Sequence, residues 1–255
     1  MHENPHQPIR KVAFSIAMKG EAQGLIEGLS MHEEGLVAHG HSPLWYRRRL
    51  DGENPLEIAL VVAGTDPIHL VDRIGTETAV LGSAFLCASF QPDLLFNVGT
   101  CGGFEARGGS IGELYLASEA FLFHGRRIPL EGFEGLGEGR IPALEAEALR
   151  KVLGAERGIV STSNSFSATS EDLAFFEAEH VSAKDMEATA LARLARDLSI
   201  PFLALKGVTD LIDHPEPEEQ AFLRNYAGVV EELTSSLLRG VEWLQEGRSI
   251  ADFNR

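Results

Sequence analysis

The stretch DLLFNVGTCGGF, residues 93–104, gives the clearest indication of the fold. Its first part, DLLFNVG (93–99), is rich in apolar residues and predicts a buried strand, and TCGGF (100–104) follows it directly. Glycines let a backbone approach a ligand closely and present its N–H groups. The spacing fits neither a dinucleotide-binding fingerprint nor a Walker loop, so a tight turn after a strand is an equally good interpretation.

Segments with strand and helix patterns alternate on both sides of this stretch. We expect strands or extended chain at 11–18, 56–64, 111–123, 158–166 and 201–210, helices at 21–31, 76–90, 142–153, 184–198 and 218–245, and polar loop at 39–55. This alternation, without internal repeats, predicts the α/β class, with a mixed, largely parallel central sheet flanked by helices. Residues 1–10 are expected to be loose, and residues 11–255 to form a single domain.

Three segments with chemically active residues reach one edge of the expected sheet. In open α/β sheets, ligands bind beyond the carboxyl ends of the strands. The segment SIAMKGE brings Glu21 to that edge, and GVTD brings Asp210, beside the glycines of NVGTCGG. The segment KDMEATALA adds Glu187 in the first turn of an expected helix.

Each of these carboxylates also has a purely structural interpretation. Glu21 and Glu187 can support helix N-termini, and Asp210 can cap a turn. Three carboxylates at one edge nevertheless suit the cleavage of a glycosidic bond. One acid protonates the leaving group, one carboxylate activates water, and one stabilises the charge that develops on the sugar.

Composition narrows the function classes. The chain has 255 residues with 22 Lys+Arg against 38 Asp+Glu, a formal charge of −16, which disfavours nucleic-acid binding. Cys87 and Cys101 lack metal-ligand spacing and are expected to be small packing residues in a reducing compartment. We expect no metal or organic cofactor, and we expect His39, His41 and His124 to lie on polar loops. The polar start of the chain and the lack of long apolar windows predict a cytoplasmic protein without membrane contact.

The combination of NVGTCGGFEARGGSIGE, HGRRIP, KDMEATALA, LKGVTDLID and EGRSIADF resembles the methylthioadenosine nucleosidases, most closely their plant-type branch. These enzymes lie within the purine nucleoside phosphorylase/uridine phosphorylase superfamily. The resemblance extends over nearly the whole chain, about 11–253. It implies hydrolysis of 5′-methylthioadenosine, with S-adenosylhomocysteine as a weaker candidate substrate, to adenine and the 5-thioribose in methionine salvage. It also implies a homodimer whose partner closes the 5′ end of the site near 123–130.

The resemblance also implies roles for individual residues. Glu21 matches the base that activates water, Glu187 the carboxylate that binds the 2′-hydroxyl, and Asp210 the general acid aimed at purine N7. Met186 matches the methionine that packs on the ribose, and Thr100 and Lys206 match positions that hold the water or the sugar hydroxyls. The other implied substrate-binding positions lie around the adenine, the thioalkyl group and the catalytic residues: Met18, Cys101, Gly102, Phe166, Ser167, Asp185, Thr209 and Phe222.

Two alternatives and one departure accompany this hypothesis. A purine nucleoside or methylthioadenosine phosphorylase needs cations for phosphate, and Asn97 stands where related phosphorylases carry arginine, leaving Arg73 and the pair Arg126-Arg127 as loose candidates. A non-catalytic nucleoside-binding or storage relative is disfavoured because all three carboxylates are present. The departure is Asn164, which replaces a common aspartate and puts the contacts to the base in question.

Overall fold

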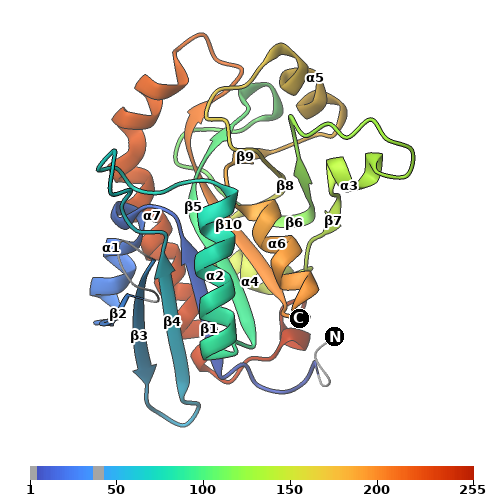
Figure 1. Ribbon diagram of the computed structural model, residues 1–255. Coiled ribbons are helices and arrows are strands. Elements are labelled where there is room, and N and C mark those ends of the chain that lie inside the picture. The colour runs from blue at the N-terminus through green and yellow to red at the C-terminus, as the bar shows by residue number, and fades with distance from the viewer. Residues whose placement is uncertain (1–4, 37–42) are drawn as a thin grey trace.

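The computed structural model describes residues 5–36 and 43–255, and its centre is a ten-stranded mixed sheet (Figure 1). The strands lie in the order β10-β6-β8-β9-β5-β1-β4-β3-β2, and β7 pairs with β6. Their bounds are β1 Lys11–Ile16, β2 His32–Leu36, β3 Leu44–Leu50, β4 Leu56–Val62, β5 Leu94–Gly103, β6 Leu114–Phe123, β7 Ile141–Pro142, β8 Glu156–Thr162, β9 Ala183–Asp185 and β10 Phe202–Leu211.

Strand β5 also pairs with β10, which closes part of the sheet on itself. The strands β10, β6, β8, β9 and β5 form a ring, and β1, β4, β3 and β2 extend from it as an open sheet. The neighbours β10, β5, β1 and β4 are all parallel, whereas β3 and β2 add an antiparallel margin. The expected α/β class with a mixed central sheet is confirmed.

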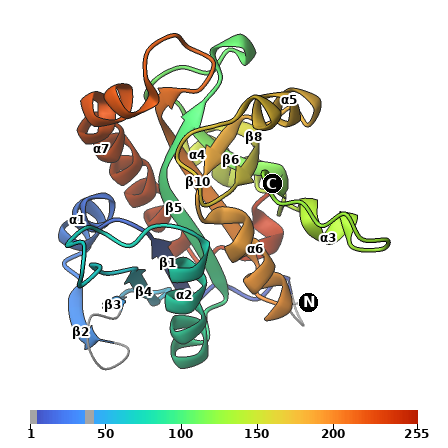
Figure 2. The same ribbon diagram turned by 45° about the horizontal axis from the view of Figure 1, so that its top comes forward.

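Helices cover both faces of the parallel strands (Figures 1 and 2). Helices α1 and α7 pack together on one face, and α2 and α6 pack together on the other. The helix bounds are α1 Lys19–Gly28, α2 Thr76–Phe90, α3 Glu134–Glu138, α4 Glu147–Leu153, α5 Ser170–Ala178, α6 Ala188–Asp197 and α7 Glu218–Gln245. Among the described residues, no helix combines the length and apolar character needed to cross a membrane.

Strand β1 shows why the sheet requires helices on both sides. Val12, Phe14 and Ile16 belong to the apolar core beneath α1 and α7, whereas Ala13 belongs to the core beneath α2 and α6. Alternate side chains of a strand point to opposite faces of the sheet. Because β1 is apolar at nearly every position, both faces of the sheet must be covered by helices.

Three parts of the expected layout are wrong in detail. The segment 39–55 was expected to be loop, but its described part contains β3, whose antiparallel pairing with β4 tolerates arginines because the strand is half-exposed. Helix α5, which begins at a capping box of Thr169 and Asp172, was not expected. Residues 1–10 were expected to be loose, yet in the described part of this segment Ile9 is buried and its N–H donates to Arg248 O.

The glycine run after residue 99 continues the strand and is not a turn. Strand β5 extends to Gly103, and Thr100, Cys101 and Gly102 all pair with residues of β10. The register of β10 shifts between Val208 and Asp210, which leaves Thr209 as a bulge. This irregularity lies where chemically active residues come together.

Candidate active site

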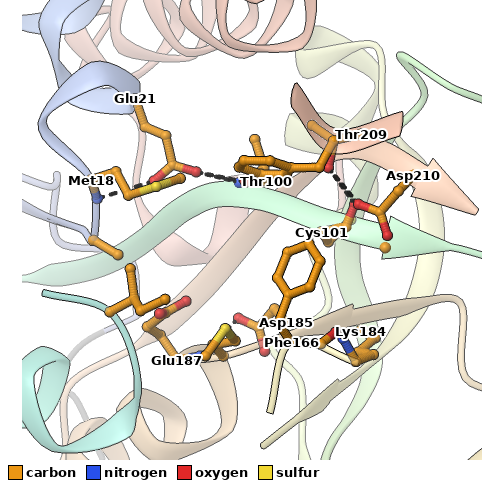
Figure 3. A pocket seen from close by; sticks show the side chains of 15 residues that line it. Met18, Glu21, Thr100, Cys101, Phe166, Lys184, Asp185, Glu187, Thr209 and Asp210 are labelled. Atoms are coloured by element: carbon orange, nitrogen blue, oxygen red, sulfur yellow. Dashed lines mark hydrogen bonds between the residues drawn. The ribbon is translucent and has the colours of Figure 1, made fainter. Parts of the chain in front are cut away.

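A cavity of about 190 Å³ lies beyond the carboxyl ends of β1, β5 and β10, and β9 forms another of its walls (Figure 3). Figure 3 shows Glu21 and Glu187 at one end and Asp210 and Lys184 at the other. The lining residues are Ala17, Met18, Glu21, Ile74, Thr100, Cys101, Gly102, Phe166, Lys184, Asp185, Met186, Glu187, Thr209, Asp210 and Phe222.

Glu21 is held by the strand beside it. Its Oε1 accepts hydrogen bonds from Thr100 N at 2.7 Å and Thr100 Oγ1 at 2.8 Å, and its Oε2 accepts from Met18 N at 3.3 Å. The last bond also supports the start of α1, as the structural interpretation expected. Burial raises the pKa of Glu21, although the hydrogen bonds from Thr100 oppose the shift. This carboxyl group therefore holds a proton more readily than one in water.

The bulge at Thr209 directs Asp210 into the cavity. Asp210 pairs with Gly102, and a Cβ on Gly102 would lie 2.9 Å from Asp210 Oδ2, so both residues face the same side. Without the extra residue, Thr209 would occupy that position and Asp210 would point to the other face. Burial raises the pKa of Asp210 to about 6, against the hydrogen bond that Thr209 Oγ1 donates at 2.8 Å.

Glu187 lies just before α6 and not in its first turn, because the helix begins at Ala188. Its Oε1 accepts a hydrogen bond from Gly75 N at 2.9 Å, at the start of α2. The carboxylate that caps α6 is Asp185, whose Oδ2 accepts from Ala188 N at 2.8 Å. Glu187 therefore does not cap α6 and lines the cavity, and burial raises its pKa against the opposing charge of Lys206.

Lys206 forms a buried ion pair behind the cavity wall. Its Nζ lies 2.7 Å from Asp185 Oδ2, with side-chain exposures of 1% and 0%. Burial by itself disfavours the ammonium group, yet Asp185, Glu187 and Glu21 together raise the pKa of Lys206. Lys206 thus remains a cation beneath the carboxylates without lining the cavity.

The structure brings together most, but not all, of the residues implied by the resemblance. Ser167 is exposed and, like Lys206, does not line the cavity. Asn164 also lies outside the lining, and its Oδ1 accepts a hydrogen bond from Thr76 N at 2.8 Å. Asn164 therefore caps the start of α2.

Three lining residues were not singled out from the sequence: Ala17, Ile74 and Lys184. Lys184 stands at the head of the KDMEATALA segment, so the motif contained it without indicating its role. Ile74 lies in a loop with no periodic pattern, and nothing local in the sequence marks it.

The remaining candidates for ligand binding lie elsewhere. Arg126 lies 4.9 Å over the ring of Phe123, and Arg127 forms an ion pair with Glu171, so neither lines the cavity. His124 was expected on a polar loop but is buried against Phe176, and burial lowers its pKa to about 4. In the described part of the chain, no group of His, Cys, Asp and Glu has the geometry to hold a metal ion. His39 and His41 lie outside the described residues.

Comparisons with known proteins agree with this geometry. Residues 11–239 match the family model of the phosphorylase superfamily. The chain is 34% identical to a 5′-methylthioadenosine nucleosidase of Arabidopsis thaliana, over 96% of this chain and 91% of that one. It is 33% identical to a 5′-methylthioadenosine/S-adenosylhomocysteine nucleosidase of the same organism, over 96% of each chain.

A solved structure extends the likeness to three dimensions. The apo form of the Arabidopsis thaliana 5′-methylthioadenosine nucleosidase superimposes with a TM-score of 0.91 at 33% identity, covering 96% of this chain and all of that one. The matched range includes Glu21, Glu187 and Asp210. The chain therefore belongs to the phosphorylase superfamily and, within it, to the family of the 5′-methylthioadenosine nucleosidases.

Proposed function

We propose that this protein hydrolyses the N-glycosidic bond of 5′-methylthioadenosine, releasing adenine and 5-methylthioribose. The observation that carries the proposal is the separation of the carboxyl groups, with Asp210 at one end of the cavity and Glu21 and Glu187 at the other (Figure 3). A nucleoside has a base to be protonated at one end and a sugar to be attacked at the other. The names of the relatives given above support this substrate.

Asp210 is proposed to act as the general acid at N7 of the adenine. Adenine leaves poorly as an anion, and a proton on N7 lets it leave as a neutral base. The raised pKa of Asp210, caused by burial, keeps a fraction of the group protonated near neutral pH. A purine lying over the carboxyl removes further water, which favours the protonated form.

Glu21 and Glu187 are proposed to act on the sugar. Glu21 accepts a proton from the attacking water, and Thr100 fixes the direction of its carboxylate. Glu187 binds the 2′-hydroxyl, and its charge stabilises the oxocarbenium-like sugar that forms as adenine departs. Met18, Met186, Phe166 and Phe222 supply apolar surface for the base, the ribose and the thioalkyl group.

Water is proposed as the nucleophile rather than phosphate. Of the described residues that line the cavity, Lys184 is the one cation, and it lies at the end occupied by Asp210. The end proposed for attack is lined by two carboxylates and by no arginine, and the nearby cation Lys206 is already paired with Asp185 behind the wall, so no lining cation is available to bind a phosphate dianion there. These charges support hydrolysis over phosphorolysis.

The proposed setting is a homodimer in the cytoplasm, acting in methionine salvage. Large apolar side chains are exposed at Leu130, 60% accessible, and Phe133, 49% accessible, next to the segment expected to close a partner's site. Exposed apolar side chains beside this segment support a contact with a partner there. Cys87 and Cys101 are buried free thiols, which suits a reducing compartment.

The test incubates the purified protein with 5′-methylthioadenosine, S-adenosylhomocysteine, adenosine and inosine, each with and without phosphate. Mass spectrometry identifies the products, and light scattering gives the mass of the assembly. Adenine with unphosphorylated methylthioribose, formed at the same rate in both buffers, supports the proposal. A sugar 1-phosphate would replace it with a phosphorylase, and no release from any nucleoside would favour a binding protein.

A further inference from the structure

Lys184 and Asp210 lie on the same rung of the sheet, on either side of Gly102. In β5, Gly102 pairs with Asp210 of β10 on one side and with Lys184 of β9 on the other. Directly paired residues point to the same face of a sheet, so both side chains emerge on the cavity side. Gly102 has no side chain to separate them, and all three residues line the cavity.

Lys184 holds two segments that are distant from it in the sequence. Its Nζ donates a hydrogen bond to Phe166 O and lies 3.7 Å from Glu218 Oε2, in the first turn of α7. It also lies 5.4 Å from the centre of the Phe166 ring. The side chain is 5% exposed, so these contacts form largely out of water.

The two segments held in this way form an aromatic wall of the cavity. Phe166 and Phe222, one from each segment, meet edge to face at 5.7 Å, and Phe222 packs against Tyr226 at 5.4 Å. Both phenylalanines line the cavity. Lys184 binds the backbone oxygen of Phe166 and the carboxylate of Glu218, which lies one turn before Phe222. Lys184 therefore fixes the distance between the two rings.

The same two charges face Asp210. Lys184 approaches from β9 and favours its carboxylate, Glu218 approaches from α7 and disfavours it, and Thr209 of β10 donates a hydrogen bond to it. The neighbour from β5 is Cys101, a buried thiol whose own pKa is raised by burial. Lys184 and Glu218 are thus opposing charges next to the proposed acid.

We propose that Lys184 is a positioning residue for the hydrolysis, which anchors the Phe166 segment over the adenine and, with Glu218, balances the charge that faces Asp210. This inference rests on the proposed function. It predicts that removing either charge changes the proton affinity of Asp210, in opposite directions. It also predicts that Lys184 contributes to adenine binding independently of any bond cleavage.

The experiment compares Lys184→Met, Lys184→Arg, Glu218→Gln and a surface control, Lys151→Met, whose side chain is 69% exposed. Steady-state kinetics with 5′-methylthioadenosine are measured across pH, and calorimetry measures the affinity for adenine. Lys184→Met should raise KM and weaken adenine binding by about five- to tenfold, and Lys184→Arg should recover most of the loss.

The pH profile separates positioning from a merely structural role. Asp210 must be protonated, so activity falls as pH rises through its pKa. Lys184→Met should move this alkaline limb to higher pH and Glu218→Gln to lower pH, whereas loss of stability alone moves neither. The inference would be overturned if the alkaline limbs of the two variants stayed in place or moved in the same direction. It would also be overturned if Lys184→Met kept the KM and the adenine affinity of the wild type.

Failure of the proposed function gives a different result. If the wild-type protein releases no adenine from any nucleoside, the hydrolysis is refuted, and calorimetry with adenine still tests Lys184. In that case, the positioning role is overturned if the wild type does not bind adenine, or if Lys184→Met binds it as tightly as the wild type. If Lys184→Met binds adenine more weakly, as predicted, the role of Lys184 in anchoring the Phe166 segment is supported.

Discussion

Thr100 donates two hydrogen bonds to a single oxygen of Glu21, from its backbone N at 2.7 Å and from Oγ1 at 2.8 Å. The other oxygen of Glu21 has a longer contact, 3.3 Å from Met18 N. One oxygen is thus fully engaged while the second retains a lone pair. This asymmetry suits the proposed role of Glu21 as the base, because one oxygen fixes the direction of the carboxylate and the other keeps a lone pair that can accept a proton.

Glu21→Gln should therefore bind substrate but hydrolyse it slowly. We expect kcat to fall by roughly 10²- to 10⁴-fold, the range typical for the loss of a general base, with KM little changed. Glu27→Gln, on the exposed side of the same helix, is the matched control and should leave kcat unchanged. Turnover of Glu21→Gln within tenfold of the wild type would assign the base to another group.

Asp210→Asn should abolish adenine release and at the same time stabilise the fold above neutral pH. The pKa of Asp210 is raised to about 6 from an ordinary value of 3.8, so the folded state holds its proton more tightly than the unfolded state. Its contribution to stability is present below pH 3.8 and is lost as pH rises through about 6.

Denaturant unfolding at two pH values measures this effect. The free energy of unfolding of Asp210→Asn, relative to the wild type, should be at most about 3 kcal/mol higher at pH ~7.5 than at pH ~3.5. Glu21 and Glu187 are unchanged in the comparison, so their titration largely cancels. A stability difference that does not vary with pH would contradict the raised pKa, and retained activity would remove Asp210 as the acid.

Gly102→Ala should impair the site directly. The added methyl group would lie 2.9 Å from Asp210 Oδ2 and 2.8 Å from Ile212 Cγ1, closer than such contacts allow. We expect a loss of about 1–3 kcal/mol in stability from overpacking, together with a clear fall in kcat. Gly228→Ala, where a Cβ meets nothing within 4 Å, is the control and should gain about 0.5–1 kcal/mol. Unchanged kcat in Gly102→Ala would show that Asp210 tolerates displacement.

Asn164→Ala should destabilise α2 without altering the choice of base. The side chain accepts from Thr76 N at 2.8 Å, and loss of such a cap costs about 1 kcal/mol. Asn164→Ser, which can still cap, should recover part of the thermal stability. The ratio of rates with adenosine and inosine should stay at the wild-type value in both variants. A changed ratio of these rates would show that Asn164 contributes to recognition of the base.

The sequence allowed much of this arrangement to be predicted. Apolar runs that end in polar residues placed Glu21 and Asp210 at one sheet edge, because the carboxyl ends of parallel strands meet there. The bounds of α2 and α7 were predicted to the residue. The family, too, was identified from its motifs.

What escaped prediction depends on contacts between distant segments. The bulge at Thr209 is defined by the way in which β10 pairs with β5. No local sequence pattern predicts this shift in register. Helix α6 begins after Glu187 because Asp185 serves as its cap, whereas the sequence placed Glu187 in the first turn of an expected helix. Lys184 acquires its contacts from the loop at Phe166 and from Glu218.

Strand β5 belongs both to the open sheet and to the closed ring, and it connects the two ends of the cavity. Thr100 binds the proposed base, and Gly102 pairs with the proposed acid. Two residues of extended chain span about 6.6 Å, so one rigid strand spaces the two ends at which proton transfer is proposed. An insertion or deletion between these two residues would therefore change the distance between the proposed base and the proposed acid.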